Sequence, residues 1–170
     1  MNDTYDFLAK LPLFDRLTEE EVVSLAAISR EYSFDDNSII AYQRDVADSF
    51  YLVKNGRLYA EKVGKDGVVR DSKPYKTGDC FEETWLFEQA AHTHTIRGTG
   101  NGRLLIITQK DFLHFLKNNP DVIEGLRPFK ENGKIVAGLS EEAWKMAQRT
   151  SVKADKPSKS VELLPDELIE

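Results

Sequence analysis

The residues best suited to chemistry in this chain are crowded into one stretch, GDCFEETWLFEQAAHTHTIRG, residues 78–98. A glycine, Gly78, begins the stretch, two carboxylates follow at Glu82 and Glu83, and two imidazoles come later at His92 and His94. A glycine turn before a short helix suits a phosphate, because backbone amides and the helix dipole both favour an anion there. Carboxylates and imidazoles suit a metal ion instead. The stretch therefore raises the alternatives of an anion site, a metal site or no site.

The metal alternative depends on the spacing of the two histidines. His92 and His94 are two residues apart, so on a strand their side chains point to the same side. Glu82 or Glu83 would complete a set of two histidines and one carboxylate. A His-x-His pair on an edge strand is more often solvated, so we expect no metal site and keep His92 and His94 as secondary candidates.

Catalysis has little support in the sequence. The single cysteine, Cys80, has no basic neighbour in sequence that would lower its pKa, so we expect it to pack rather than react. His114 lies outside the apolar stripe of its predicted helix, which places it on the surface. We predict that the chain is not an enzyme.

The overall composition excludes several classes of function. The net charge of -6 and the sequence pI near 5.2 argue against nucleic acid or an anionic membrane surface as partners, since both reward a basic face. No apolar run approaches the roughly 20 residues of a membrane span, and the N-terminus lacks the pattern of a signal peptide. A single cysteine suits a reducing compartment. We therefore expect a cytoplasmic protein with no membrane contact through this segment.

Helical signals flank a run of strand signals. Thr18 and Glu21 form a capping box before one predicted helix, an earlier short helix covers about residues 3–9, Thr108 caps a third helix and Ser140 a fourth. Between them, short β-branched and aromatic runs alternate with turn residues. Three Asn-Gly or Asp-Gly pairs predict tight hairpins; they lie at residues 55–56, 66–67 and 101–102.

This order predicts an α+β fold, an antiparallel β-roll of double-stranded β-helix or jelly-roll type with flanking N- and C-terminal helices. We expect the roll domain over residues 1–125, a helical extension over 126–150, and a flexible tail or linker over 151–170. Glycines and a proline interrupt the segment after the roll, which argues against a long-helix dimer. The final VELLPDELIE is apolar and acidic, which is typical either of a short partner-binding motif or of the start of a further part of a longer, membrane-anchored protein.

From Leu11 to Pro120 the chain resembles the cyclic nucleotide-binding domain superfamily. The resemblance rests on four segments in order: LPLFDRLTEEEVVSL, FDDNSIIAYQRDVADSFYLVKNGRLYAEKV, GDCFEETWLF and LLIITQKDFLHFLKNNP. It implies an eight-stranded β-roll in which a short helical cassette grips a cyclic phosphate. In that family the cassette usually reads Gly-Asp-x-Phe-Gly-Glu, followed after about eight residues by Arg-Ser/Thr/Ala-Ala.

The cassette of this chain departs from that pattern at two positions. Glu82 stands where the glycine belongs, and His92 stands where the arginine that pairs with the phosphate belongs. Glu83 matches the glutamate that accepts from the ribose, Thr93 fits the next position, and His94 replaces an alanine. Loss of the arginine removes a partner worth about 2–5 kcal/mol, and a carboxylate about 5 Å from a phosphate costs roughly 3 kcal/mol at an effective dielectric of 20.

We therefore favour a non-catalytic regulatory or interaction module that does not bind cyclic AMP or cyclic GMP normally. Its partner would be a protein or a downstream domain, and no cofactor is expected unless it is a cyclic nucleotide. A second hypothesis is a weak sensor, in which an ordinary imidazole pKa near 6.5 lets His92 become a partial counter-charge. The ligand residues would then be Glu82, Glu83, Thr84, His92 and Thr93. The metal site remains the third hypothesis.

Overall fold

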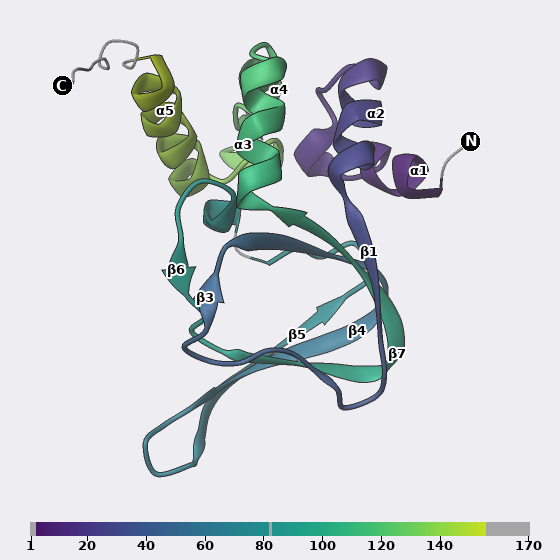
Figure 1. The fold of residues 1–170 in the computed structure, drawn as a ribbon, viewed down its shortest axis with the longest axis vertical. Helices are drawn as coiled ribbons and strands as arrows, with labels where there is room; N and C mark the ends of the chain where they lie inside the picture. Colours follow the sequence, from purple (N-terminus) through teal and green to yellow (C-terminus); the bar gives the residue numbers. More distant parts are fainter. Residues whose placement is uncertain (1–2, 82, 156–170) are drawn as a thin grey trace, which may run out of the picture.

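The computed structural model describes residues 3–81 and 83–155 and places the helices together at one end of a β-roll (Figure 1). The helices before the roll are α1 (Asp3–Ala9), the 3-10 helix η1 (Pro12–Phe14) and α2 (Glu19–Ile28). Those after it are α3 (Gln109–Asn118), α4 (Val122–Gly125) and α5 (Glu141–Asp155). The predicted α+β class, with helices on both sides of the strands in sequence, is confirmed.

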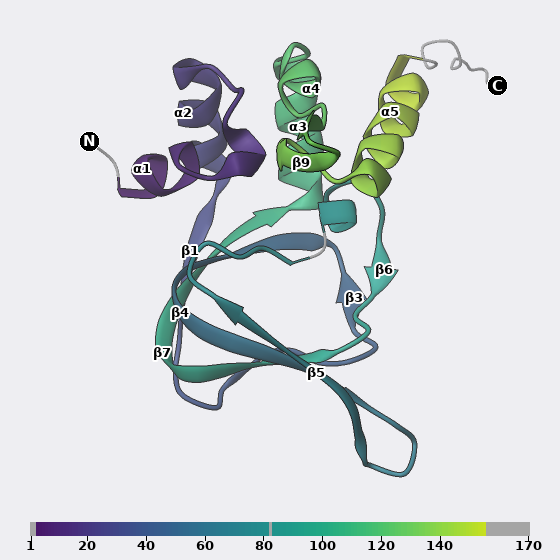
Figure 2. The ribbon, with the colours of Figure 1, turned by 180° about the vertical axis from the view of Figure 1, so that it is seen from behind.

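The roll itself is antiparallel throughout. Its described strands are β1 (Arg30–Phe34), β2 (Ile39–Ala41), β3 (Val46–Ala47), β4 (Ser49–Val63), β5 (Val69–Lys76), β6 (Ala90–Ala91) and β7 (Thr95–Thr108). The main sheet has the order β1-β7-β4-β5, and β2 also pairs with β7, while β3 pairs with β6. Seen from behind, β3 and β6 lie on one side of the roll, and the long strands β4 and β7 bend around the opposite side (Figure 2).

Two of the three predicted hairpins are wrong. Only Asp66-Gly67 makes one, between β4 and β5. Asn55-Gly56 and Asn101-Gly102 lie inside the long strands β4 and β7, where the register shifts between Val53 and Arg57. The two glycine pairs face each other, so that a Cβ on Gly102 would overlap the Asn55 carbonyl oxygen and the Phe34 ring. They allow two strands to bend together rather than each strand to turn back.

The N-terminal helical signals are confirmed. The Thr18 side chain accepts from the Glu21 amide, and the Glu21 carboxylate accepts from the Thr18 amide, which completes the predicted capping box. Thr108 caps α3 by accepting from the Asp111 amide. Phe112 and Phe115 are buried on one face of α3. His114 is exposed on the same helix, as expected.

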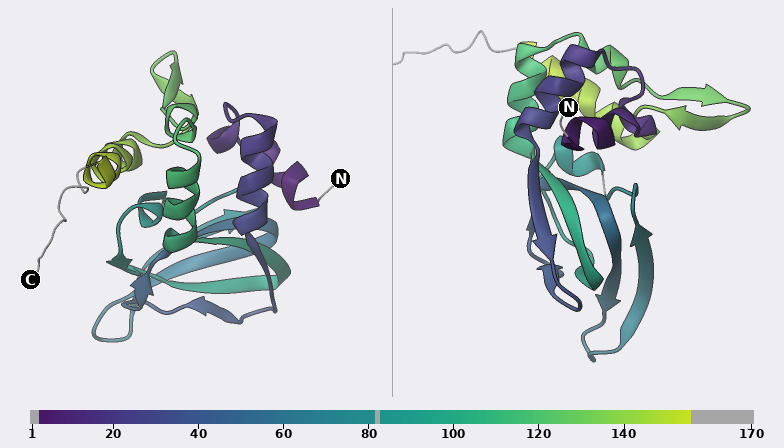
Figure 3. Two further views of the ribbon diagram at one scale, coloured as in Figure 1. Left: turned by 45° about the horizontal axis from the view of Figure 1, so that its top comes forward. Right: turned by 90° about the vertical axis from the view of Figure 1, so that its right-hand side faces the viewer.

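The segment predicted as a helical extension, residues 126–150, is only partly helical. A hairpin of β8 (Phe129–Glu131) and β9 (Lys134–Ala137) comes first and projects beyond the helical layer (Figure 3). The helix α5 follows, and Ser140 caps it by accepting from the Ala143 amide, as predicted. Because α5 continues to Asp155, the first part of the tail predicted over 151–170 is helical, and residues 156–170 lie outside the described part.

The position of α5 is fixed by the chain just before it. The Gly138 amide donates to the Pro12 carbonyl and the Leu139 amide to the Leu126 carbonyl. Gly138 has a φ of +83°, and a Cβ there would overlap the Arg127 carbonyl, so only glycine fits this turn. Leu139 and Trp144 then join the core that the helices share with the roll. Among the described helices, none is long and apolar enough to cross a membrane.

A buried lysine ties α1 to the roll. The Lys54 side chain, on β4, is 8% exposed, and its Nζ lies 2.7 Å from Asp3 Oδ2 and 2.8 Å from Glu31 Oε1. Hydrogen bonding to Lys54 is the largest cause that lowers the pKa of Asp3 and the pKa of Glu31. The three residues form a small charge network between the first helix, β1 and β4.

We expect Gly102→Ala to destabilise the fold by about 1–3 kcal/mol, because the added methyl group must displace the Asn55 backbone or the Phe34 ring. Urea unfolding followed by circular dichroism measures this loss. The matched control is Thr99→Ala, at an exposed position of the same strand β7. Equal stability of Gly102→Ala and the parent would show that the strands do not approach this closely.

We expect Lys54→Met to reduce the difference in the free energy of unfolding between neutral and acidic pH. The pKa values of Asp3 and Glu31 are lowered below their ordinary 3.8 and 4.5, so the unfolded chain takes up protons first as the pH falls. Their stabilisation is therefore present above about pH 5 and is lost as the pH falls through the folded values. Urea unfolding at pH 7 and pH 4 measures the difference. Lys65→Met, at an exposed turn, should keep the parental slope, and a parental slope in Lys54→Met would contradict the network.

Candidate functional site

The stretch singled out in the sequence folds against a cavity of about 420 Å³ in the roll. Its aromatic wall is formed by Tyr75, Phe81, Trp85 and His92. Its polar wall is formed by Asp71, Lys73, Glu83, Thr93 and His94. This volume lies within the range of about 300–1,000 Å³ that is usual for small-molecule sites.

The start of the stretch is structural. Gly78 has a φ of +93°, which permits the turn after β5, and the Asp79 carboxylate closes that turn by accepting from the Lys76 amide at 2.8 Å. Phe81 is 4% exposed and packs with Tyr51 and Tyr75 in the core of the roll. Cys80 packs against the core as a partly buried residue, in agreement with its predicted role.

His92 is buried among aromatic rings. It is 3% exposed, its ring is parallel to that of Tyr51 at a centroid distance of 6.1 Å, and it meets Trp85 edge-on at 4.6 Å. Its backbone is held by the loop between β2 and β3, because its amide donates to the Asp45 carbonyl and its carbonyl accepts from the Arg44 amide. Trp85, 9% exposed, therefore belongs to the core.

Burial lowers the pKa of His92, and the carboxylates of Asp45 and Asp48 oppose that shift only in part. The imidazole is therefore neutral at neutral pH, and its Nδ1 has no hydrogen-bond partner among the described atoms. The hypothesis that His92 acts as a partial counter-charge near pH 6.5 assumed an ordinary pKa. The structure corrects that assumption, because desolvation disfavours the charged form.

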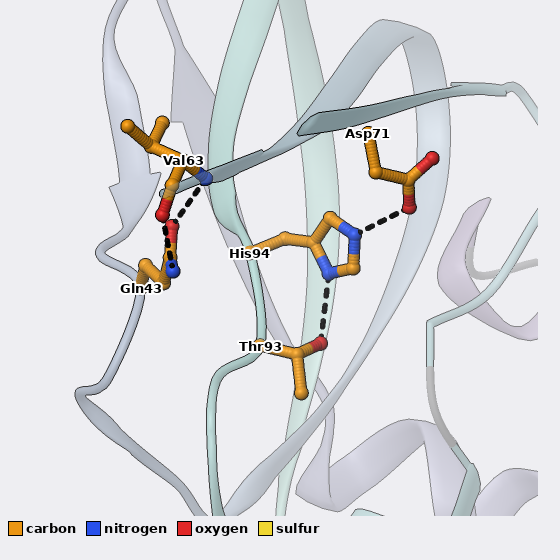
Figure 4. A network of polar contacts seen from close by, with 5 residues as sticks. All are labelled: Gln43, Val63, Asp71, Thr93 and His94. Carbon is orange, nitrogen blue, oxygen red and sulfur yellow. Dashed lines mark hydrogen bonds and ion pairs between the residues drawn. The ribbon is translucent and has the colours of Figure 1, made fainter. Parts of the chain in front are cut away.

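His94 differs from His92 in its environment. Both histidines lie in the loop between β6 and β7, and not on a strand as predicted. His94 Nε2 lies 2.9 Å from Asp71 Oδ2, and Thr93 Oγ1 lies 2.7 Å from His94 Nδ1, as Figure 4 shows. The hydrogen bond to His94 lowers the pKa of Asp71. Within the part of the chain that the structure describes, no group of three metal-binding side chains is found.

Glu83 lies in the 3-10 helix η2 (Glu83–Leu86) and reaches the C-terminal helix. Its Oε1 accepts from the Ser140 amide at 2.8 Å, at the N-terminus of α5. A carboxylate is favourable there, because it satisfies an unpaired amide and faces the positive end of the helix dipole. The residue predicted to accept a ligand hydroxyl thus already accepts from the protein backbone.

Only some of the predicted site residues line the cavity. Thr93 and Glu83 line the cavity, whereas Thr84 is buried in η2 and is not among the described residues that line it. Glu82 lies outside the described residues. The prediction missed Asp71 and Lys73, which β5 contributes to the polar wall. Their alternation with Tyr75 was the available signal, since residues two apart on a strand face the same side.

Known proteins share the family and the fold of this chain. Residues 31–119 match the family model described as cyclic nucleotide-binding domain. The cAMP-dependent protein kinase regulatory subunit of Blastocladiella emersonii is 25% identical over 69% of this chain and 29% of that subunit. The corresponding subunit of Aspergillus niger is 32% identical over 53% of this chain and 21% of that subunit. The chain thus spans less than a third of the length of these two relatives.

Solved structures show the same fold. The N-terminal domain of a transcriptional regulator from Streptomyces coelicolor A3(2) superposes with a TM-score of 0.67 at 20% identity, over 92% of this chain and 99% of that one. The regulatory domain of Toxoplasma gondii PKA with cAMP superposes with a TM-score of 0.61 at 24% identity, over 71% of this chain and 47% of that one.

We expect Glu83→Ala to loosen the start of α5, because it leaves the partly buried Ser140 amide without its acceptor. The cost is about 1–3 kcal/mol. Hydrogen exchange at Ser140, measured by NMR, should accelerate. Glu83→Gln is the matched control, since its amide oxygen can still accept and should preserve most of the protection. Unchanged protection in Glu83→Ala would show that this hydrogen bond does not hold the helix.

Proposed function

Since the chain belongs to the cyclic nucleotide-binding domain family, whose match covers residues 31–119, we propose that it is a non-catalytic regulatory module unable to hold a cyclic phosphate tightly. The curated proteins to which it is similar include regulatory subunits of cAMP-dependent protein kinases. By analogy, its output passes to a protein partner or a downstream domain. The proposal concerns the ligand site, where this chain departs from the family pattern.

The observation that carries the proposal is the state of His92. This residue stands where the family pattern has the arginine that pairs with the phosphate. It is buried against Tyr51 and Trp85, and burial lowers its pKa. A neutral, stacked imidazole supplies neither the permanent charge nor the paired donors of a guanidinium.

The other charged residues of the cavity do not replace the missing guanidinium. Among the described residues that line it, Lys73 is the one permanent cation, and its Nζ lies 5.3 Å from the centre of the Tyr75 ring. The two carboxylates of Asp71 and Glu83 line the same cavity. A bound phosphate would therefore meet more negative than permanent positive charge. Glu82 adds a further carboxylate to this segment of the sequence.

The non-catalytic part of the proposal is supported by the arrangement of Thr93, His94 and Asp71. In a serine-protease triad the nucleophile faces Nε2 of the histidine and the acid faces Nδ1. Here Thr93 is on Nδ1 and Asp71 on Nε2, and the threonine and histidine are adjacent in sequence. The chain of hydrogen bonds suits the shaping of a site better than nucleophilic attack.

The test is calorimetric titration of the full chain with cyclic AMP and cyclic GMP at pH 7.5. Loss of the arginine costs about 2–5 kcal/mol, which moves a micromolar dissociation constant towards the millimolar range. We expect the double variant Glu82→Gly/His92→Arg to bind at least tenfold more tightly than the parent, since it restores both family residues.

Two controls sharpen the result. Glu82→Gly alone separates removal of the carboxylate from addition of the guanidinium, and thermal unfolding of each variant confirms that the arginine is accommodated. Micromolar binding of either cyclic nucleotide by the parent would refute the proposal. A folded double variant that gains no affinity would show that other features of the cavity exclude the cyclic phosphate.

A further inference from the structure

The polar wall of the cavity has a fixed donor and acceptor pattern, and that pattern indicates what the cavity takes. Thr93, His94 and Asp71 form a continuous chain of hydrogen bonds, with contacts of 2.7 Å and 2.9 Å (Figure 4). All three residues line the 420 Å³ cavity, as do Lys73 on β5 and Glu83 on η2.

The carboxylate determines the direction of this chain. Asp71 can only accept when ionised, and hydrogen bonding to His94 lowers its pKa. His94 must therefore carry its proton on Nε2 and donate it to Asp71. In the neutral imidazole Nδ1 is then bare and accepts, so the Thr93 hydroxyl donates to it. Thr93 consequently presents lone pairs, and no proton, to the cavity.

The charged groups of the lining disfavour an anion, because two carboxylates, Asp71 and Glu83, outnumber the one Lys73 ammonium. Together with the Thr93 oxygen, the carboxylates present mainly acceptors, which suit a ligand that brings its own donors. An uncharged ligand also avoids the repulsion between a cation and Lys73. Hydroxyl groups on a ring satisfy this condition, and the aromatic wall of Tyr75, Phe81 and Trp85 offers apolar surface to the ring itself.

We propose that this cavity binds an uncharged ring bearing several hydroxyl groups, and that the Asp71–His94–Thr93 chain selects it by presenting Thr93 as an acceptor. The inference rests on the proposed function, because it assumes that a cyclic phosphate is not held. Nucleosides and monosaccharides share the required chemistry. Asp71 and His94 act as positioning residues, whereas Thr93 contacts the ligand.

The first test is titration of the full chain at pH 8 with adenosine, guanosine, D-ribose and D-glucose, and with cyclic AMP for comparison. We expect saturable binding of the nucleosides or of the sugars, at least tenfold tighter than that of cyclic AMP, and the two groups of probes identify the source of the ring. Absence of binding by all four uncharged probes overturns this inference and leaves the proposed function intact. Tighter binding of cyclic AMP overturns both.

Variants of Thr93 test its part in recognition. Thr93→Val keeps the shape and removes the hydroxyl, so it should weaken binding of the preferred probe at least tenfold, and Thr93→Ser should retain it. Thr99→Val, at an exposed position of β7 outside the cavity, is the matched control. Parental affinity in Thr93→Val would overturn the role of this hydroxyl.

Nitrogen NMR of His94 tests the hydrogen-bond chain without a ligand. At pH 8 the spectrum should show a protonated Nε2 and a bare Nδ1, and Asp71→Ala should remove that preference and weaken binding of the preferred probe. A proton on Nδ1 in the parent would overturn the inference, because Thr93 would then be free to donate.

Discussion

The antiparallel ladder between β4 and β7 is the constraint on which the rest of the structure depends. These strands pair along almost their whole length, from Ser49 with Thr108 to Glu61 with Thr95. The register of the ladder shifts near Asn55, and there Gly56 and Gly102 approach so closely that side chains are excluded. The bend lets the Phe34 ring pack on the glycines and closes the roll around its core. The cavity depends on this ladder, because β5 pairs with β4 and the loop that carries His92 and His94 leads directly into β7.

Under the proposed function, the difference from the family pattern at position 92 determines much of the chemistry of the cavity. An arginine at position 92 would need solvent or an anion for its guanidinium, whereas a histidine can be buried as a neutral ring. Once buried, His92 packs with Tyr51 and Trp85 and becomes part of the core, and desolvation then keeps it uncharged. His92 therefore stabilises the wall of a cavity whose polar groups come from β5, from η2 and from the loop between β6 and β7.

The sequence predicted what local patterns determine. Capping at Thr18, Thr108 and Ser140 was correct, because these caps involve residues three apart. The glycine pairs at 55–56 and 101–102 were misread, because a turn and a bulge need the same backbone freedom, and only the pairing of distant strands distinguishes them. The hairpin of β8 and β9 was also missed. The glycines and the proline in this segment argue against a helix, but they do not indicate that the short stretches between them pair as strands.

The sequence identified residues of the candidate site, but not their burial or their contacts with one another. Glu83 and Thr93 were identified from the cassette, and both line the cavity. The sequence could not show that His92 and His94 have different environments. The burial of His92 depends on Tyr51 and Trp85, and the polar partner of His94, Asp71, lies on the distant strand β5. Two histidines of the same stretch thus differ in chemistry through tertiary contacts alone.

Glu83 connects the cavity to the C-terminal part of the chain. It lines the 420 Å³ cavity and also a second one of about 390 Å³ beneath β9, and Ser140 lines both as well. The hydrogen bond between Glu83 Oε1 and the Ser140 amide therefore lies at the boundary of the two cavities. A carboxylate has two oxygens and several lone pairs, so Glu83 can accept from a ligand hydroxyl in the cavity while Oε1 still accepts from the Ser140 amide. One side chain thus contributes both to the polar lining of the cavity and to the start of α5, in a segment whose position is otherwise fixed by Gly138 and Leu139.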